Sequence, residues 1–179
     1  MSNSDIKVWI KRNNTLECEF IIKNGAESHD ILEIKKDEVV ALSANNINFY
    51  DLNKRDKTHS ISDFESFYLN PGKKFCKAND ELLLVCGKNN IFLVDYQAYQ
   101  LINKIDCQNT VTLYKLSSNF VLSGQENGDI KQWQCNGRDI KLFSYKKGDI
   151  SSTVTSIFKL NNIIILGNKN GELKFFEFQ

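Results

Sequence analysis

The chain has 179 residues, of which 41% are hydrophobic, so it is long enough to bury one sizeable core and too short for several independent domains. Its 23 basic and 22 acidic residues nearly cancel, which gives no electrostatic field for gathering nucleic acid or anionic lipid. No apolar run approaches a membrane span, and the amino terminus does not resemble a signal peptide. We therefore expect no nucleic-acid partner and no membrane insertion.

The five cysteines are scattered, odd in number and never spaced as CxxC. This pattern argues against a disulfide framework or a zinc site and favours a reducing, cytoplasmic location.

Short strand-forming segments follow one another along the whole chain. Each is rich in Val, Ile, Phe or Tyr and ends at a cluster of Asn, Gly, Asp or Lys, as in meandering antiparallel strands. No segment keeps a helical period for long enough to predict a helix. In chain order, strands are expected at residues 6–11, 16–23, 31–34, 39–43, 47–52, 58–62, 74–78, 82–86, 91–96, 101–106, 111–116, 119–124, 130–135, 140–145, 154–160, 163–167 and 173–178.

Residues 110–133 and 153–176 are two copies of one motif. The segment TVTLYKLSSNFVLSGQENGDIKQW returns without a gap as TVTSIFKLNNIIILGNKNGELKFF. The apolar residue that opens the third strand of each unit recurs with a period of about 42, typical of a β-propeller blade with four strands. These anchors are Ile6, Ile47, Ile91, Ile130 and Leu173.

With the four strands of a unit labelled a to d, the chain reads c-d, then three complete a-b-c-d units, then a-b-c. This order predicts one partial propeller domain over residues 1–179, with about four blades' worth of strands in an open arc or incomplete ring. The d strand at residues 16–23 could complete the last unit and close a four-bladed ring within the chain. The c strand at residues 6–11 would then duplicate the c strand at residues 173–178. We therefore expect the missing blades to come from a second copy, a partner subunit or a longer polypeptide.

These units resemble WD-repeats, whose c strands end in Trp-Asp. Here the corresponding pairs are Trp9-Ile10, Tyr50-Asp51, Val94-Asp95, Trp133-Gln134 and Phe176-Glu177. The turns GQENGD and GNKNGE are similar to the b–c turn of that family, but its Gly-His pair is missing. The resemblance implies a divergent WD-repeat-like propeller in which the family's His–Ser/Thr–Asp–Trp hydrogen-bond network is not expected in any blade.

Two local features follow from this alignment. The dipeptides Asn127-Gly128 and Asn170-Gly171 predict hairpin turns with positive φ at both positions. The b strands are continuous apolar runs, as expected for strands covered on both faces. We therefore expect four residues at equivalent b-strand positions to be buried, namely Val40, Leu83, Val121 and Ile164.

The sequence predicts no catalytic, cofactor-binding or metal-binding residue. His29 and His59 are the only histidines, and neither lies in a metal-binding or triad pattern. The glycines form no phosphate-binding motif, and Cys76 and Cys86 are expected to pack in strands as small hydrophobic residues.

Two loops are candidate partner-binding sites. Phe64, Phe67 and Tyr68 lie in a long d–a connection, and in the WD-repeat family such loops lie on the face that commonly meets partners. Exposed aromatic residues there would serve as anchors. The alternative is that Phe67 and Tyr68 extend an a strand or plug the central channel. Lys146 and Lys147, in the last d–a loop, form either a small basic contact or a solvated turn.

The leading functional hypothesis is a non-catalytic scaffold for protein–protein interactions, acting within a multi-subunit complex and needing no cofactor. One alternative is a propeller-based enzyme or small-ligand binder with its site at the channel mouth. Another is a substrate-recognition subunit of a ubiquitin ligase.

Overall fold

The computed structural model describes residues 5–23, 28–43, 46–62, 74–87, 89–148 and 152–177. In these ranges the chain forms seventeen strands, and it divides into two compact units, Met1–Phe67 and Tyr68–Gln179. Each unit is described by itself, and a single domain over residues 1–179 stays a prediction. No helix with the length and hydropathy of a membrane span occurs in the ranges given above.

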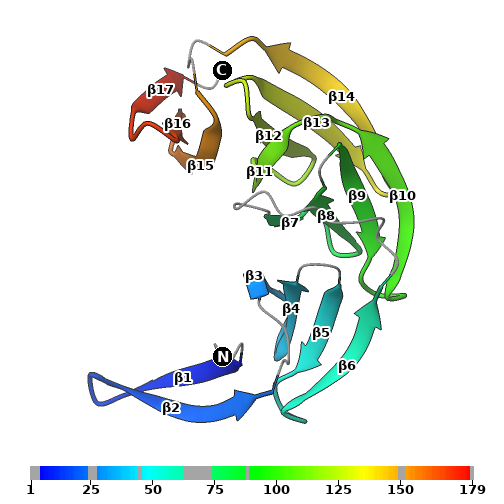
Figure 1. Ribbon diagram of the computed structural model, residues 1–179, viewed down its shortest axis with the longest axis vertical. Helices are drawn as coiled ribbons and strands as arrows, with labels where there is room; N and C mark the ends of the chain where they lie inside the picture. Colours follow the sequence, from blue (N-terminus) through cyan, green and yellow to red (C-terminus); the bar gives the residue numbers. More distant parts are fainter. Residues whose placement is uncertain are drawn as a thin grey trace. The chain divides into compact units, whose positions relative to one another are not determined.

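The first unit contains a two-stranded and a four-stranded antiparallel sheet (Figure 1). The smaller sheet pairs β1 (Ile6–Arg12) with β2 (Thr15–Ile22). The larger one, in the order of its chain, consists of β3 (Ser28–Lys35), β4 (Glu38–Ser43), β5 (Ile47–Asp51) and β6 (Asp56–Ile61). A core cluster joins the two sheets, with Ile6 and Ile22 against Ala41 and Tyr50.

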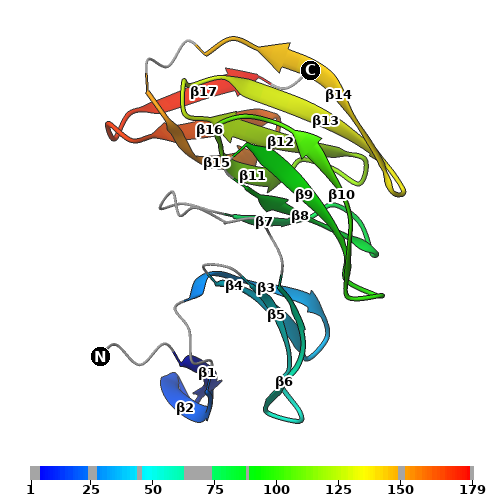
Figure 2. The ribbon, with the colours of Figure 1, turned by 45° about the vertical axis from the view of Figure 1, so that its right-hand side comes forward.

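The second unit contains three antiparallel sheets (Figures 1 and 2). The first consists of β7 (Phe75–Lys77), β8 (Leu82–Cys86), β9 (Asn90–Asp95) and β10 (Gln100–Asp106). The second consists of β11 (Thr110–Lys115), β12 (Phe120–Gln125), β13 (Ile130–Asn136) and β14 (Asp139–Lys146). The third, at the red end of the colour scale, has β15 (Val154–Leu160), β16 (Ile163–Asn168) and β17 (Leu173–Glu177).

The strand order confirms the predicted sequence of units, since consecutive strands pair within each sheet. The c–d pairs also share an irregularity in pairing. The register shifts just before Trp9, Tyr50 and Trp133 on their c strands, and opposite Val94 in the remaining pair. Because the same bulge recurs at the same position, these four residues are structurally equivalent.

Sheets of the second unit stack through apolar faces. We call the face of a sheet that packs on the next sheet along the chain its forward face, and the opposite one its rear face. The forward face of β11–β14 and the rear face of β15–β17 form one core cluster. Its forward-face members are Tyr114, Leu116, Phe120, Leu122 and Ile130, and its rear-face members are Val154, Ile157, Ile164, Leu166 and Phe176.

The rear face of β11–β14 packs in the same way on β7–β10. Leu113, Val121 and Trp133 share a cluster with Leu84 and Ile91 of the preceding sheet. Cys76 and Cys86 belong to this buried cluster as well, which confirms their predicted role as small packing residues. The second unit is thus three layers of sheet held by two apolar interfaces.

The b-strand burial prediction is confirmed, but one of its equivalences is wrong. Val40, Leu83 and Val121 are fully buried, and Ile164 is 9% exposed. Val121 lies opposite Trp133, and the residue opposite Tyr50 in the first unit is Val39. Val39, not Val40, therefore occupies the equivalent position, and Val40 points to the other face because side chains alternate along a strand.

The gap-free alignment of the two copies also fails for one strand. Asn168 lies 43 residues after Gln125, whereas their partners Val154 and Thr110 are 44 residues apart. The strand β15 is therefore displaced by one residue from the sequence alignment. The difference arises in the a–b turn, which has three residues between Leu116 and its partner Phe120 but two between Leu160 and its partner Ile163.

The b–c turns contain left-handed glycines, as predicted, with φ of 88° at Gly128 and 81° at Gly171. The prediction of positive φ at Asn127 and Asn170 is wrong, because neither is among the left-handed residues. The loop between β12 and β13 has three residues instead of two, since the backbone amide of Gln125 donates to the backbone carbonyl of Asp129 at 2.9 Å. A loop of that length needs only its last residue in the left-handed region.

Candidate functional site

Of the two predicted binding loops, the structure describes residues of only the second. Phe64, Phe67 and Tyr68 lie outside the described residues, so their role stays a prediction. Lys146 is the last residue of β14 and Lys147 follows it, and both side chains are exposed.

Lys146 packs against the next sheet of its own unit. Its Nζ lies 3.8 Å from the centroid of the Phe176 ring on β17. A cation above an aromatic face is attracted by the ring quadrupole. The Lys146 side chain therefore bridges two sheets in addition to carrying its charge to the surface.

A small groove lies beside this contact, between β11–β14 and β15–β17. It has a volume of about 170 Å³, below the range of about 300–1,000 Å³ typical of small-molecule sites. Its walls are mainly apolar, with Leu122 and Ile164 among them, and the lining includes Lys146. The groove has the size of one inserted side chain, and it belongs to the packing between two sheets.

The loop that carries Lys147 is anchored by Asp129. The Tyr145 hydroxyl donates to Oδ2 of this carboxylate at 2.6 Å, the Asn127 amide donates to Oδ2 at 2.7 Å, and the Gly148 amide donates to Oδ1 at 2.7 Å. Burial would raise the pKa of Asp129, but these hydrogen bonds and the charge of Lys147 outweigh it and hold the pKa below its usual value.

Gly148 makes this anchoring possible by its lack of a side chain. A Cβ at this position would lie 2.3 Å from the carbonyl oxygen of Gly128, which is closer than any real contact. Gly148 therefore rests directly on the backbone of the b–c turn. Lys147 is thus exposed next to an anchored residue, and its role as a basic contact or a solvated turn stays a prediction.

A buried polar network runs through β11, β12 and β13. The Trp133 indole and the Gln125 amide both donate to Ser123 Oγ at 2.9 Å, and the Thr110 hydroxyl donates to Gln125 Oε1 at 3.3 Å. Ser123 and Trp133 make a serine–tryptophan contact, but neither a histidine nor an aspartate takes part, so this is not the four-residue family network. Gln125 supplies the donor to Ser123. The sequence signal was Ser123 and Gln125 two residues apart on one strand, with Trp133 on the next.

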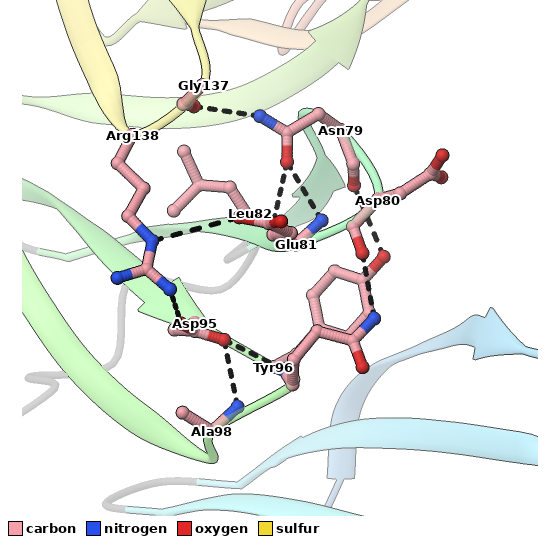
Figure 3. A network of polar contacts seen from close by, with 10 residues as sticks. Asn79, Asp80, Glu81, Leu82, Asp95, Tyr96, Ala98, Gly137 and Arg138 are labelled. Carbon is pink, nitrogen blue, oxygen red and sulfur yellow. Dashed lines mark hydrogen bonds and ion pairs between the residues drawn. The ribbon is translucent and has the colours of Figure 1, made fainter.

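A second polar network ties the β13–β14 turn to the sheet before it (Figure 3). Asp95, fully buried at the end of β9, accepts hydrogen bonds from the backbone amides of Gln97 and Ala98, both at 2.9 Å. Its other oxygen binds the guanidinium of Arg138, which also lies 3.8 Å from Glu81. Asp51 makes the equivalent backbone contacts with Asn53 and Lys54 in the first unit.

Asn79 completes this network. Its amide donates to the Gly137 carbonyl at 2.8 Å, and its Oδ1 accepts from the backbone amides of Glu81 and Leu82. Gly137, with φ of 60°, turns its carbonyl toward Asn79 (Figure 3). The Asp129 and Asp95 networks therefore hold turns in place, and the Ser123 network joins three strands of one sheet.

The thiols near these networks are held in the neutral form. Burial, with Cys135 nearby, raises the pKa of Cys76 to about 12, and burial raises the pKa of Cys135 to about 11. A thiol in such surroundings is a poor nucleophile at neutral pH. In the part of the chain that the structure describes, no three His, Cys, Asp or Glu side chains are placed to hold a metal ion.

The forward face of β15–β17 is an exposed apolar surface. Five of its side chains are strongly exposed: Phe158, Leu160, Ile163, Leu173 and Phe175. Strand pairing places Phe158, Ile165 and Phe175 side by side across the three strands. The sequence pattern did not single out these five side chains as exposed, because alternation along a strand does not tell which of its two faces a neighbouring sheet covers.

No family model matches the chain, and no curated protein matches it. Solved structures do. A chain in the crystal structure of the mitotic checkpoint complex aligns with a TM-score of 0.79 and 11% identity over 99% of this chain, which spans 57% of that chain's length. The crystal structure of the computationally designed Ika4 protein aligns with a TM-score of 0.61 and 22% identity, covering 81% of this chain and 88% of that one. At these identities the likeness shows the fold alone, and the fold is an all-β, β-propeller-like one built from antiparallel blades.

Proposed function

We propose that this protein is a non-catalytic, WD-repeat-like propeller module that binds other protein chains within a multi-subunit assembly. The observation that carries the proposal is the exposed apolar forward face of β15–β17. Phe175 is 63% exposed and Leu173 62%, on a sheet whose other face is packed. Contiguous apolar patches on soluble proteins mark interaction sites.

The polar networks support the same function. Asp129 fixes the loop of Lys147, and Asp95 with Arg138 fixes the β13–β14 turn. Loops held on a rigid scaffold bind partners with little loss of conformational entropy. We propose that the missing blades are supplied by a partner chain, by a copy or by a further segment, and that the module acts in the cytoplasm without a cofactor.

Affinity purification of the tagged chain from its own cells, followed by mass spectrometry, tests this function. One dominant, stoichiometric set of proteins is the expected result. Phe175→Asp should lower the recovery of at least one member of the set, while Lys36→Glu, an exposed change in the β3–β4 turn, should not. Recovery of a small molecule without any stoichiometric protein would contradict the proposal and favour a ligand-binding or enzymatic propeller.

A further inference from the structure

The forward face of β15–β17 has a covered counterpart within the same unit. Pairing relates Phe158 and Ile165 on this sheet to Tyr114 and Leu122 on the preceding one. Leu173 corresponds in the same way to Ile130. Tyr114, Leu122 and Ile130 all pack in the cluster that joins β11–β14 to β15–β17. Residues of the same kind at the same positions therefore pack on the next sheet in one case, whereas on β15–β17 Phe158 and Leu173 are exposed and Ile165 is half-buried.

The surface that covers β11–β14 shows what kind of surface would fit the exposed face of β15–β17. The cover is the rear face of an antiparallel sheet, with aliphatic residues on its b strand and an aromatic residue, Phe176, on its c strand. Phe176 lies opposite Ile164 just as Trp133 lies opposite Val121. The matching surface is thus a rear sheet face with a large aromatic residue at this c-strand position.

The chain itself presents such a rear face, on the sheet β1–β2 of the first unit. Trp9 stands directly after the same bulge as Trp133, yet it is 54% exposed where Trp133 is 4% exposed. Leu16 and Ile21 are exposed on the same side of the sheet, since they pair with Lys11 and Lys7, which flank Trp9.

The charges at the two faces are opposite in sign. Lys7 and Lys11 lie on the side of Trp9, whereas Glu177 stands next to Phe175 on the forward side of β17, opposite Ile163. Unlike charges at the rim of an apolar contact favour this pairing and disfavour a contact of either face with itself.

We propose that the protein assembles head to tail with a second copy of itself, an inference that rests on its proposed function as an interaction module. The forward face of β15–β17 in one copy packs on the Trp9 face of sheet β1–β2 in the other, repeating between chains the interface that joins β11–β14 to β15–β17. Such a contact uses two different surfaces, so it either closes into a ring or continues along a row of copies.

Sedimentation of the purified full chain over a wide concentration range tests the proposal. We expect the mass to rise with concentration above the 20.6 kDa of one chain. Phe175→Asp blocks the forward face and Trp9→Asp blocks the rear face, so each variant alone should sediment as a single chain. An equimolar mixture of the two should recover a complex of about twice that mass, because one intact face of each kind remains.

Controls separate assembly from folding. Leu142→Asp places the same charge on an exposed apolar residue of β14 outside both faces, and it should assemble like the wild type. Circular dichroism melting should be nearly unchanged in every variant. Leu173→Asp is the second forward-face variant, and it replaces Phe175→Asp should that variant fail to fold.

Three outcomes would overturn the inference. These are a wild-type chain that stays single at all concentrations, a Trp9→Asp variant that still self-associates, and a mixture of the two variants that stays single. A chain that stays single yet is recovered from cells with other stoichiometric proteins would overturn this inference and leave the proposed function in place.

Discussion

At the b–c turns, one glycine carries the left-handed backbone conformation that the loop requires. Gly171 has φ of 81°, and no atom lies within 4 Å of the position that its Cβ would occupy. A substitution there meets no steric clash with neighbours. Its cost is therefore the backbone penalty alone, which makes the site a clean measure of that penalty.

We expect Gly171→Ala to lower the free energy of unfolding by roughly 1–2 kcal/mol. Gly171→Asn should cost less, since asparagine tolerates the left-handed region better than other residues with a Cβ. Urea unfolding of both variants checks this order. An alanine variant as stable as the asparagine variant would contradict the assigned turn geometry.

Asp129 gives the chain a pH-dependent contact. Its folded pKa lies below the ordinary value of 3.8, so its contribution to stability is fully present above that value and is lost as the pH falls through the folded pKa. Asp129→Asn should cost roughly 1–3 kcal/mol at neutral pH, and the difference from wild type should shrink in strong acid. Urea unfolding at pH 7 and at successively lower pH measures it. A difference that stays constant with pH would refute this role of the carboxylate.

The alternation of side chains along β16 decides what a substitution does to the whole sheet. Ile164 is 9% exposed and faces β11–β14, whereas its neighbour Ile163 is 39% exposed on the opposite face. Ile164→Asp would bury an unpaired charge and should unfold its sheet. Ile163→Asp should melt within a few degrees of wild type. Equal melting temperatures for the two variants would show that the assigned faces are wrong.

In the last sheet, the strand β15 departs from the sequence repeat that the other strands keep. The bulges before Trp9, Tyr50 and Trp133 recur, yet β15 slips by one residue because its turn is one residue shorter. A one-residue slip exchanges the two faces of a strand. Tyr114 thereby corresponds to Phe158 and not to Ile157.

In the described part of the second unit, apolar interfaces join β7–β10 to β11–β14 and β11–β14 to β15–β17. In such layered repeats, the unfolding of one layer affects the adjacent layer most, since stability is a sum of layer and interface terms. In the Ile164→Asp variant, amide exchange should rise most in β15–β17, less in β11–β14 and least in β7–β10. Hydrogen-exchange mass spectrometry measures this gradient. A uniform rise across the three sheets would show that Tyr68–Gln179 opens as one cooperative unit.

The sequence by itself determined the fold class, the order of the strands and the place of the left-handed glycines. These follow from local rules: alternating apolar runs form strands, Gly128 and Gly171 accept φ values that other residues avoid, and the repeat carries both from one unit to the next. The burial of Val121 and Leu83 followed for the same reason.

Only the tertiary structure decided which faces are covered. Phe175 and Trp133 belong to similar apolar strands, but one is 63% exposed and the other 4%, because burial depends on the neighbouring sheet and not on the strand itself. The contact of Arg138 with Asp95 joins residues 43 positions apart, and no local pattern predicts such a pair. The faces and the polar anchors were set by how the layers meet.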